Sequence, residues 1–114
     1  MSSVIRVEKT KNYTVMSNQH FHVQNMSLKA KGLLSLILSL PDDWEYSISG
    51  LSSICKESKG TIKSVLDELK QLGYLEVIKH SPSVENGGRY TYEYIIYEIS
   101  KTPENLQMKW KKTD

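Results

Sequence analysis

The sequence predicts a single α+β domain in which three main helices precede a C-terminal β-hairpin. Its 114 residues are enough for one compact domain with its own core. Two segments, 28–40 and 59–72, repeat apolar residues at helical spacing. The pair Asn86-Gly87 then separates two β-prone runs, and such a pair is the strongest short-range signal for a hairpin.

The composition excludes several other classes of protein. Hydrophobic residues make up 39 % of the chain and charged residues 25 %, which is typical of globular proteins and too apolar for a disordered chain. The longest apolar stretch, Leu33 to Leu40, is too short to cross a membrane. The N-terminus has no signal-peptide pattern, so we expect a cytoplasmic protein without membrane contact.

The cysteine and the histidines predict neither a disulfide nor a metal site. Cys55 is the single cysteine, and its position favours a buried small side chain over a reactive thiol. His20 and His22 lie close together, but His80 is distant, so no set of three or four zinc ligands results. Residues 58–61 contain a lysine and a threonine, but the other residues of a phosphate-binding loop are missing. No catalytic motif is found. We expect no enzyme activity, no cofactor and no small-molecule ligand.

Positive charge is concentrated at the two ends of the chain. Residues 1–12 and 99–114 each carry a net charge of +2, whereas the residues between them carry a net charge of −2. Basic ends can contact phosphates from outside a folded domain, and they can equally be solvated. We expect a flexible N-terminal segment 1–12, a folded domain 13–99 and a basic C-terminal tail 100–114.

The first main helix is expected from Leu28 to Leu40. Ser27 is a suitable N-cap, and Pro41 cannot continue the helix. The expected buried stripe consists of Ala30, Leu33, Leu34 and Ile37. Before this helix we expect a short strand at 13–16 and a helical turn at 19–22.

A short second helix is expected after Ser47, which is again a suitable N-cap. The helical spacing of Leu51, Ile54 and Cys55 predicts that all three face inward. The preceding residues 44–47 are β-prone and predict a very short strand. Residues 56–58 then predict a turn.

The third helix, from Lys59 to Leu72, is the most strongly predicted element. Its apolar residues all lie on one face, and they are Ile62, Val65, Leu66, Leu69 and Leu72. Gly73 stands where a helix commonly ends in a left-handed residue. On the exposed face, Asp67 is placed to pair with Lys63 or with Lys70.

The hairpin is predicted from two β-prone runs, 74–79 and 89–97, on either side of the turn residues 81–88. Three tyrosines alternate along the second run, a pattern more typical of cross-strand packing than of base stacking. They are Tyr90, Tyr92 and Tyr94. Both faces of this strand carry large residues, so the sequence leaves open which face is buried.

Two helices joined by a tight turn, with a hairpin after the second, form a winged helix-turn-helix. Three stretches also resemble a known family: Leu28-Lys-Ala-Lys-Gly-Leu-Leu, Leu38-Ser-Leu-Pro-Asp-Asp-Trp44 and Leu66-Asp-Glu-Leu-Lys-Gln-Leu-Gly-Tyr-Leu75. They resemble the helix-turn-helix module of replication proteins from Gram-positive phages, plasmids and integrated elements. That module is similar to the N-terminal part of DnaD-like replication initiators. The resemblance covers residues 13–98, and it implies a winged-helix fold and a role in DNA replication.

The third helix supplies most candidate DNA-binding residues, because the second helix of a helix-turn-helix places its N-terminal residues in the major groove. These candidates are Ser58, Lys59, Gly60, Thr61, Lys63 and Ser64. Lysines and hydroxyls there can contact phosphates or base edges, although the same face can also be merely solvated. Asp67 and Glu68 would repel phosphate, so we expect only the first two turns to enter the groove.

The wing adds Arg89 as a further candidate. An arginine at this position can enter a minor groove or contact a phosphate. It can equally be a strand-edge charge that discourages aggregation.

We therefore expect a non-enzymatic protein that binds double-stranded DNA in phage or plasmid replication or its regulation. A homodimer would raise the weak affinity expected of one copy. Two alternatives remain. The same fold can be a protein-interaction module that binds a replication or host protein, as the negative charge of the central region favours, or it can be a transcriptional repressor.

Overall fold

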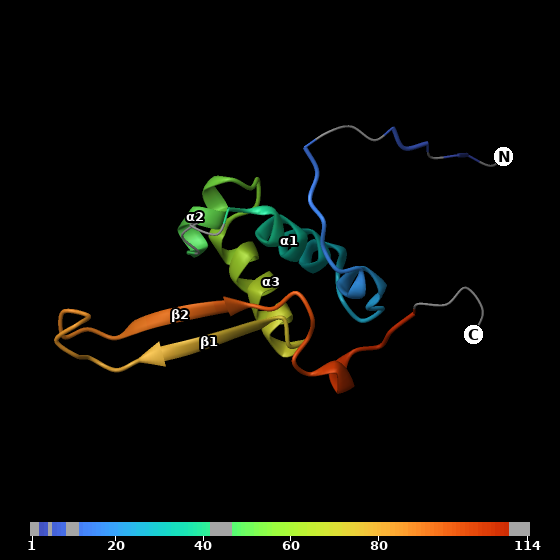
Figure 1. Ribbon diagram of the computed structural model, residues 1–114. Coiled ribbons are helices and arrows are strands. Elements are labelled where there is room, and N and C mark those ends of the chain that lie inside the picture. The colour runs from blue at the N-terminus through green and yellow to red at the C-terminus, as the bar shows by residue number, and fades with distance from the viewer. Residues whose placement is uncertain (1–2, 5, 9–11, 42–46, 110–114) are drawn as a thin grey trace.

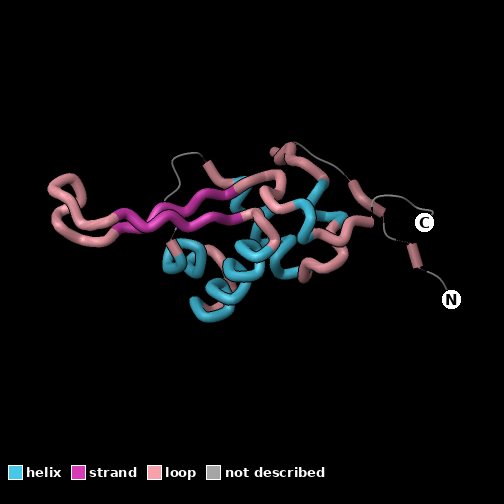
Figure 2. The backbone as a smooth tube through the Cα atoms, turned by 90° about the horizontal axis from the view of Figure 1, so that it is seen from below, coloured by secondary structure: helices cyan, strands magenta, loops and turns pink. Residues whose placement is uncertain are grey.

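The computed structural model describes residues 3–4, 6–8, 12–41 and 47–109. Its helices and strands are α1 (Leu28–Ser39), α2 (Ile48–Ser53), α3 (Lys59–Gln71), β1 (Leu75–His80) and β2 (Thr91–Ile96), with 3₁₀ helices at Gln19–His22 and Pro103–Asn105. The helices lie on one side of the hairpin, whose turn projects beyond them (Figure 1, Figure 2). The predicted α+β class, with three main helices before a hairpin, is confirmed. The strand predicted at 44–47 involves residues outside the described ranges.

Serine caps begin all three α-helices, as the sequence predicts. The hydroxyl oxygens of Ser27, Ser47 and Ser58 each accept a hydrogen bond from the backbone N–H three residues later, at 3.1, 2.9 and 3.3 Å. Each bond satisfies one of the N–H groups that the first helical turn leaves without a partner. The helix starts are therefore fixed by local sequence alone.

The N-terminus of α1 is also bound to α3 through Glu68. The backbone N–H and the hydroxyl of Ser27 donate to the two carboxylate oxygens of Glu68, at 2.6 and 2.7 Å. A carboxylate at a helix N-terminus is favourable, because it accepts from free donors and faces the positive end of the helix dipole. Glu68 thus holds α1 and α3 together, and its charge is not directed at solvent as the sequence suggested.

The apolar stripes of α1 and α3 face each other in one core. The buried hydrophobic residues are Val23, Met26, Ala30, Leu33, Leu34, Ile37, Leu51, Ile62, Val65, Leu66, Leu69, Leu72, Tyr74 and Leu75. α3 contacts α1, α2 and β1, so its stripe is covered by three neighbouring elements. The stripes predicted for both long helices are confirmed.

One predicted core position is wrong. Ile54 is 42 % exposed, whereas Leu51 is buried and Cys55 is half-buried. α2 ends at Ser53, and Ile54 has the dihedral angles φ −108° and ψ 5°, outside the helical range. Because the helix has stopped, the spacing that predicted an inward side chain no longer applies.

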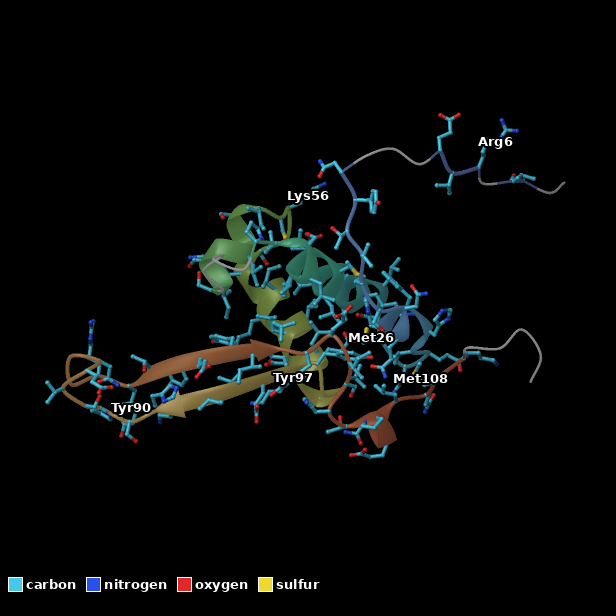
Figure 3. All side chains as sticks on the ribbon, viewed as in Figure 1. Arg6, Met26, Lys56, Tyr90, Tyr97 and Met108 are labelled. Carbon is cyan, nitrogen blue, oxygen red and sulfur yellow. The ribbon has the colours of Figure 1, made fainter. Side chains whose placement is uncertain are left out.

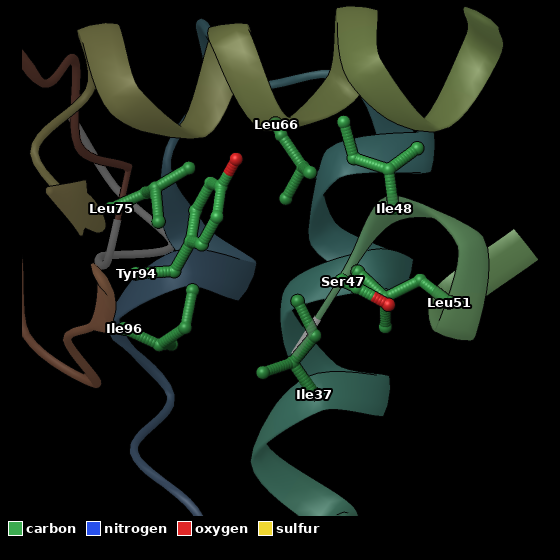
Figure 4. A pocket seen from close by; sticks show the side chains of 8 residues that line it. All are labelled: Ile37, Ser47, Ile48, Leu51, Leu66, Leu75, Tyr94 and Ile96. Carbon is green, nitrogen blue, oxygen red and sulfur yellow. The ribbon is translucent and has the colours of Figure 1, made fainter. Parts of the chain in front are cut away.

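The hairpin buries the face that carries Tyr94, which settles the question that the sequence left open. In the antiparallel register, Val77 pairs with Tyr94 and Leu75 pairs with Ile96. These four side chains pack against the helices. Leu75, Tyr94 and Ile96 meet α1, α2 and α3 at an apolar pocket of about 10 Å³, into which the ring of Tyr94 points (Figure 4).

The chain continues to pack on the domain beyond the boundary expected at Ile99. Ser100 is buried, and its hydroxyl donates to Leu72 O at 2.6 Å. Lys101 N donates to Gly73 O at 2.9 Å. Further on, Met108 forms an antiparallel bridge with Val23. Residues 100–109 therefore cross the C-terminal end of α3 and reach the 3₁₀ helix at Gln19–His22 (Figure 1).

The N-terminal segment shows one confirmed element and one that is absent. The helical turn predicted at 19–22 is present. The strand predicted at 13–16 is not formed, and the side chains of Tyr13 and Val15 are 79 % and 86 % exposed. β-prone residues form a strand only where a neighbouring strand supplies hydrogen bonds, and no described segment pairs with these residues.

Gly73 is the position at which a side chain should be least tolerated. Its φ is +85°, and an added Cβ would lie 2.4 Å from Thr102 Oγ1 and 2.7 Å from Thr102 N. We expect Gly73→Ala to lower the free energy of unfolding by at least about 2 kcal/mol, from left-handed backbone strain and overpacking. Gly32→Ala is the matched control, because its Cβ would meet nothing within 4 Å in the middle of α1. Urea unfolding should show that this control gains up to about 1 kcal/mol. Equal effects of the two changes would contradict this account.

His20 is fully buried beside α1 and forms one hydrogen bond from its ring. Nε2 lies 2.8 Å from Ser35 Oγ, which itself donates to Lys31 O. Nδ1 has no hydrogen-bond partner among the described residues. Burial lowers the pKa of His20, an effect that Glu98 opposes and Lys31 reinforces.

The domain should therefore lose stability in mild acid. The unfolded chain binds a proton at His20 near pH 6.5, whereas the folded domain resists it, so the free energy of unfolding should fall as pH drops below about 6.5. The glutamine of His20→Gln can still donate to Ser35 but does not titrate. This change should therefore remove the contribution of His20 to the slope of the free energy of unfolding against pH. Urea unfolding of both proteins between about pH 7 and pH 5 measures the difference. Identical slopes would show that His20 is not responsible.

Candidate nucleic-acid interface

The polar face of α3 is exposed because its apolar face is fully used by the core. Of the six candidates on this helix and its cap, five are exposed, and Thr61 is half-buried. The exposed candidates are Ser58, Lys59, Gly60, Lys63 and Ser64. The structure thus places these residues over the first two turns of α3. They lie next to the turn that follows α2 (Figure 1), which carries Lys56 (Figure 3).

The hydroxyls at the start of α3 partly serve the helix itself. Ser58 Oγ accepts from Thr61 N, and it lies 3.2 Å from Thr61 Oγ1. Thr61 also lines a groove between α1 and α3, together with Cys55. Ser64 has neither role, so its hydroxyl is the one most accessible to a ligand. Gly60 has room for a side chain, since its Cβ would meet only Ser58 Oγ at 3.9 Å.

Lys63 forms an ion pair with Asp67. Its Nζ lies 3.3 Å from both carboxylate oxygens, and the two side chains are 62 % and 56 % exposed. An exposed i, i+4 pair is worth only about 0.2–0.5 kcal/mol and is screened by salt. A phosphate can therefore displace Asp67 from Lys63 at little cost. The alternative pair of Asp67 with Lys70 is not formed in the part of the chain that the structure describes.

The other carboxylate that the sequence placed against phosphate is directed at α1. Glu68 is half-buried and accepts from Ser27 of α1. Asp67 therefore remains the exposed acidic group on the described turns of α3. The barrier to phosphate is smaller than two free carboxylates would make it.

Arg89 lies in the hairpin turn, apart from the other candidates. The turn is shaped by Asn86, whose side chain accepts from Ser83 N at 2.7 Å and donates to Ser81 O at 2.9 Å. Gly87 and Gly88 follow with φ values of +71° and +74°. The resulting turn projects away from the helices and leaves Arg89 exposed (Figure 2). It can reach only a ligand that extends along the hairpin.

The hairpin adds a cation outside the proposed set of contacts, Lys79, on its inner face. Its Nζ lies 4.2 Å from the centroid of the Tyr90 ring, in a cation–π contact. It pairs across the strands with Tyr92. The alternating tyrosines indicated an aromatic face on the second strand. Because the two faces of that strand carry residues of similar size, the sequence did not determine which cations lie beside the tyrosines.

Other kinds of site have little support in the described residues. They contain no group of three or more side chains that could hold a metal ion. None of their helices is long and apolar enough to cross a membrane.

The fold and the exposed helix face define a winged helix-turn-helix domain. α2, the turn and α3 form the helix-turn-helix, and β1 and β2 form the wing. In agreement, residues 24–75 match the family model of a helix-turn-helix domain. This match spans the three helices and the residues that lead into β1. Comparisons with curated proteins and with solved structures gave no significant match.

Proposed function

We propose that this protein binds double-stranded DNA by placing the N-terminal turns of α3 in the major groove. The observation that carries the proposal is the exposed, cation-bearing face of α3 within a helix-turn-helix domain. The proposed contacts are Ser58, Lys59, Gly60, Thr61, Lys63 and Ser64, with Arg89 reaching the DNA beyond the helix. Residues with these side chains can bind both phosphates and base edges.

The biological role that we propose is initiation of DNA replication, or its regulation, in the cytoplasm of a bacterial host of a phage or plasmid. The support for it is the resemblance of three stretches, the most specific being Leu38-Ser-Leu-Pro-Asp-Asp-Trp44, to the modules of such replication proteins. A transcriptional repressor would use the same DNA-binding face. Footprinting on the replication origin and on the promoters of the phage or plasmid distinguishes these two roles.

Two copies on one site would give a useful affinity. The proposed face of α3 carries two lysines, one of which is paired with Asp67. Few phosphate contacts per copy mean weak binding and a shallow dependence on salt. A homodimer on a two-fold symmetric site would multiply the contacts without any new kind of interaction.

Lys59→Ala tests the docking of α3. Lys59 is exposed, so the fold should be unchanged. We expect the affinity for duplex DNA to fall severalfold and the slope of log K against log salt to become shallower by about one, because one phosphate contact is lost. Fluorescence anisotropy with labelled duplex at about 50 and 200 mM salt measures both quantities.

Lys101→Ala is the matched control for this experiment. Lys101 is also exposed, but it lies over the Tyr97 ring on the opposite end of the domain from the start of α3. It should change duplex affinity much less than Lys59→Ala. If Lys59→Ala behaved like this control, or if the folded wild type bound no duplex, the proposal would fail.

A protein-interaction module is the second candidate, and the outer face of the hairpin favours it. Ile78 and Ile95 lie on this face, away from the helices, and are half-buried at most. Partly exposed apolar side chains on a sheet are typical of surfaces that bind another protein. Failure of duplex binding together with a bound replication or host protein would favour this candidate.

A further inference from the structure

A groove separates α3 from the inner face of the hairpin. It has a volume of about 220 Å³ and is bordered by Lys63, Asp67 and Lys70 of α3 and by Tyr92 and Tyr94 of β2. This volume is below the roughly 300 Å³ of the smallest sites for drug-sized ligands. The groove therefore has room for one group about the size of a nucleobase.

Packing against the core explains the position of one tyrosine of the groove but not that of the other. Tyr94 is half-buried against the core, as cross-strand packing predicts. Tyr92 is 56 % exposed, although it borders the same groove. A large exposed ring bordering a groove is a surface on which another flat ring can stack. Tyr92 is thus an aromatic platform that the fold itself does not use.

Cations gather on the same side of the hairpin as Tyr92. Lys79 is its direct cross-strand partner, while Lys63 and Lys70 border the groove from α3. The exposed acids of β1 and β2 lie on the opposite face, because Glu76 and Glu93 occupy the alternate positions of the strands. The side of the hairpin that carries Tyr92 thus has one lysine, and the groove has two more lysines beside one acidic residue, Asp67.

We propose that this groove binds an unpaired DNA strand, with one base stacked on Tyr92 and neighbouring phosphates on Lys63, Lys70 and Lys79. Aromatic rings beside a positively charged groove are how proteins bind single strands without reading their sequence. A paired base cannot use the site, since both of its faces are stacked inside the duplex. The proposal goes beyond duplex docking and does not depend on it, because Tyr92, Lys70 and Lys79 lie outside the face proposed for the major groove.

Anisotropy with a labelled oligothymidylate of about 12 nucleotides, within the usual range of site sizes, tests the proposal on the full chain. We expect salt-sensitive binding that Tyr92→Ala weakens by at least about fivefold, the smallest usual effect of losing one base–aromatic stack. Tyr92→Phe keeps the ring and should keep the affinity. Asp67→Asn removes the acidic group and should strengthen binding. Tyr92 is exposed, so circular dichroism should show that each variant folds.

Two variants separate this proposal from duplex docking. Lys59 does not border the groove, so Lys59→Ala should weaken duplex binding and leave the single strand bound. Tyr92→Ala should do the reverse. Absence of single-strand binding, or an affinity indifferent to Tyr92→Ala, would overturn the groove proposal whatever the duplex result.

Photocrosslinking locates the bound base directly. An oligonucleotide carrying 5-iodouracil should crosslink to Tyr92 on irradiation, and mass spectrometry of the digest identifies the peptide. Crosslinks confined to other residues would overturn the proposal. Binding of poly-glutamate with the same dependence on Tyr92 would also overturn it, since the groove would then select negative charge rather than bases.

Discussion

The whole arrangement depends on the division of α3 into an apolar and a polar face. Ile62, Val65, Leu66 and Leu69 require burial, and α1, α2 and β1 all pack against them. Burying each such side chain contributes roughly 1.5–3 kcal/mol, so no other orientation of this helix competes. Because three elements share the apolar face, the polar residues at the start of the helix are left exposed. The exposure of Lys59 and Lys63 is thus a consequence of core packing.

Polar contacts then fix the C-terminal part of α3 in space. In its last turn, Glu68 accepts from the N–H of Ser27, and hydrogen bonds to charged groups contribute about 1.5–3 kcal/mol each. At its C-terminus, Gly73 turns the chain into β1 and accepts from Lys101, while Ser100 satisfies the carbonyl of Leu72. The segment after β2 therefore holds the helix end to which the hairpin is joined. A recognition helix and a wing keep one mutual position only if this junction is rigid.

The parts of the fold that the sequence predicts well are those decided within a few residues. Serine caps, the stripe of α3 and the left-handed Gly73 all follow from local chemistry, and the structure has them. The buried face of the hairpin is a tertiary choice, because Tyr94 and its neighbours on the other face are similarly large. The packing of residues 100–109 is equally hidden, since its hydrogen bonds join segments that are distant in sequence and each uses a backbone group. Among site residues, the exposed positions of α3 follow from its stripe, whereas Lys79 depends on the strand register.

The net charge of the exposed face of α3, more than its number of lysines, governs what that face can bind, and Asp67 shows why. It neutralises Lys63 in the free protein and borders the groove beside Lys70. A phosphate that displaces it gains one lysine but stays close to a carboxylate. The cost of displacing such an exposed pair is about 0.2–0.5 kcal/mol, whereas the remaining repulsion persists in the complex. Asp67 therefore weakens the binding of nucleic acid to a single copy at both of the proposed surfaces. Contacts that carry no charge, such as stacking on Tyr92 or a second copy on the same DNA, would then supply most of the affinity.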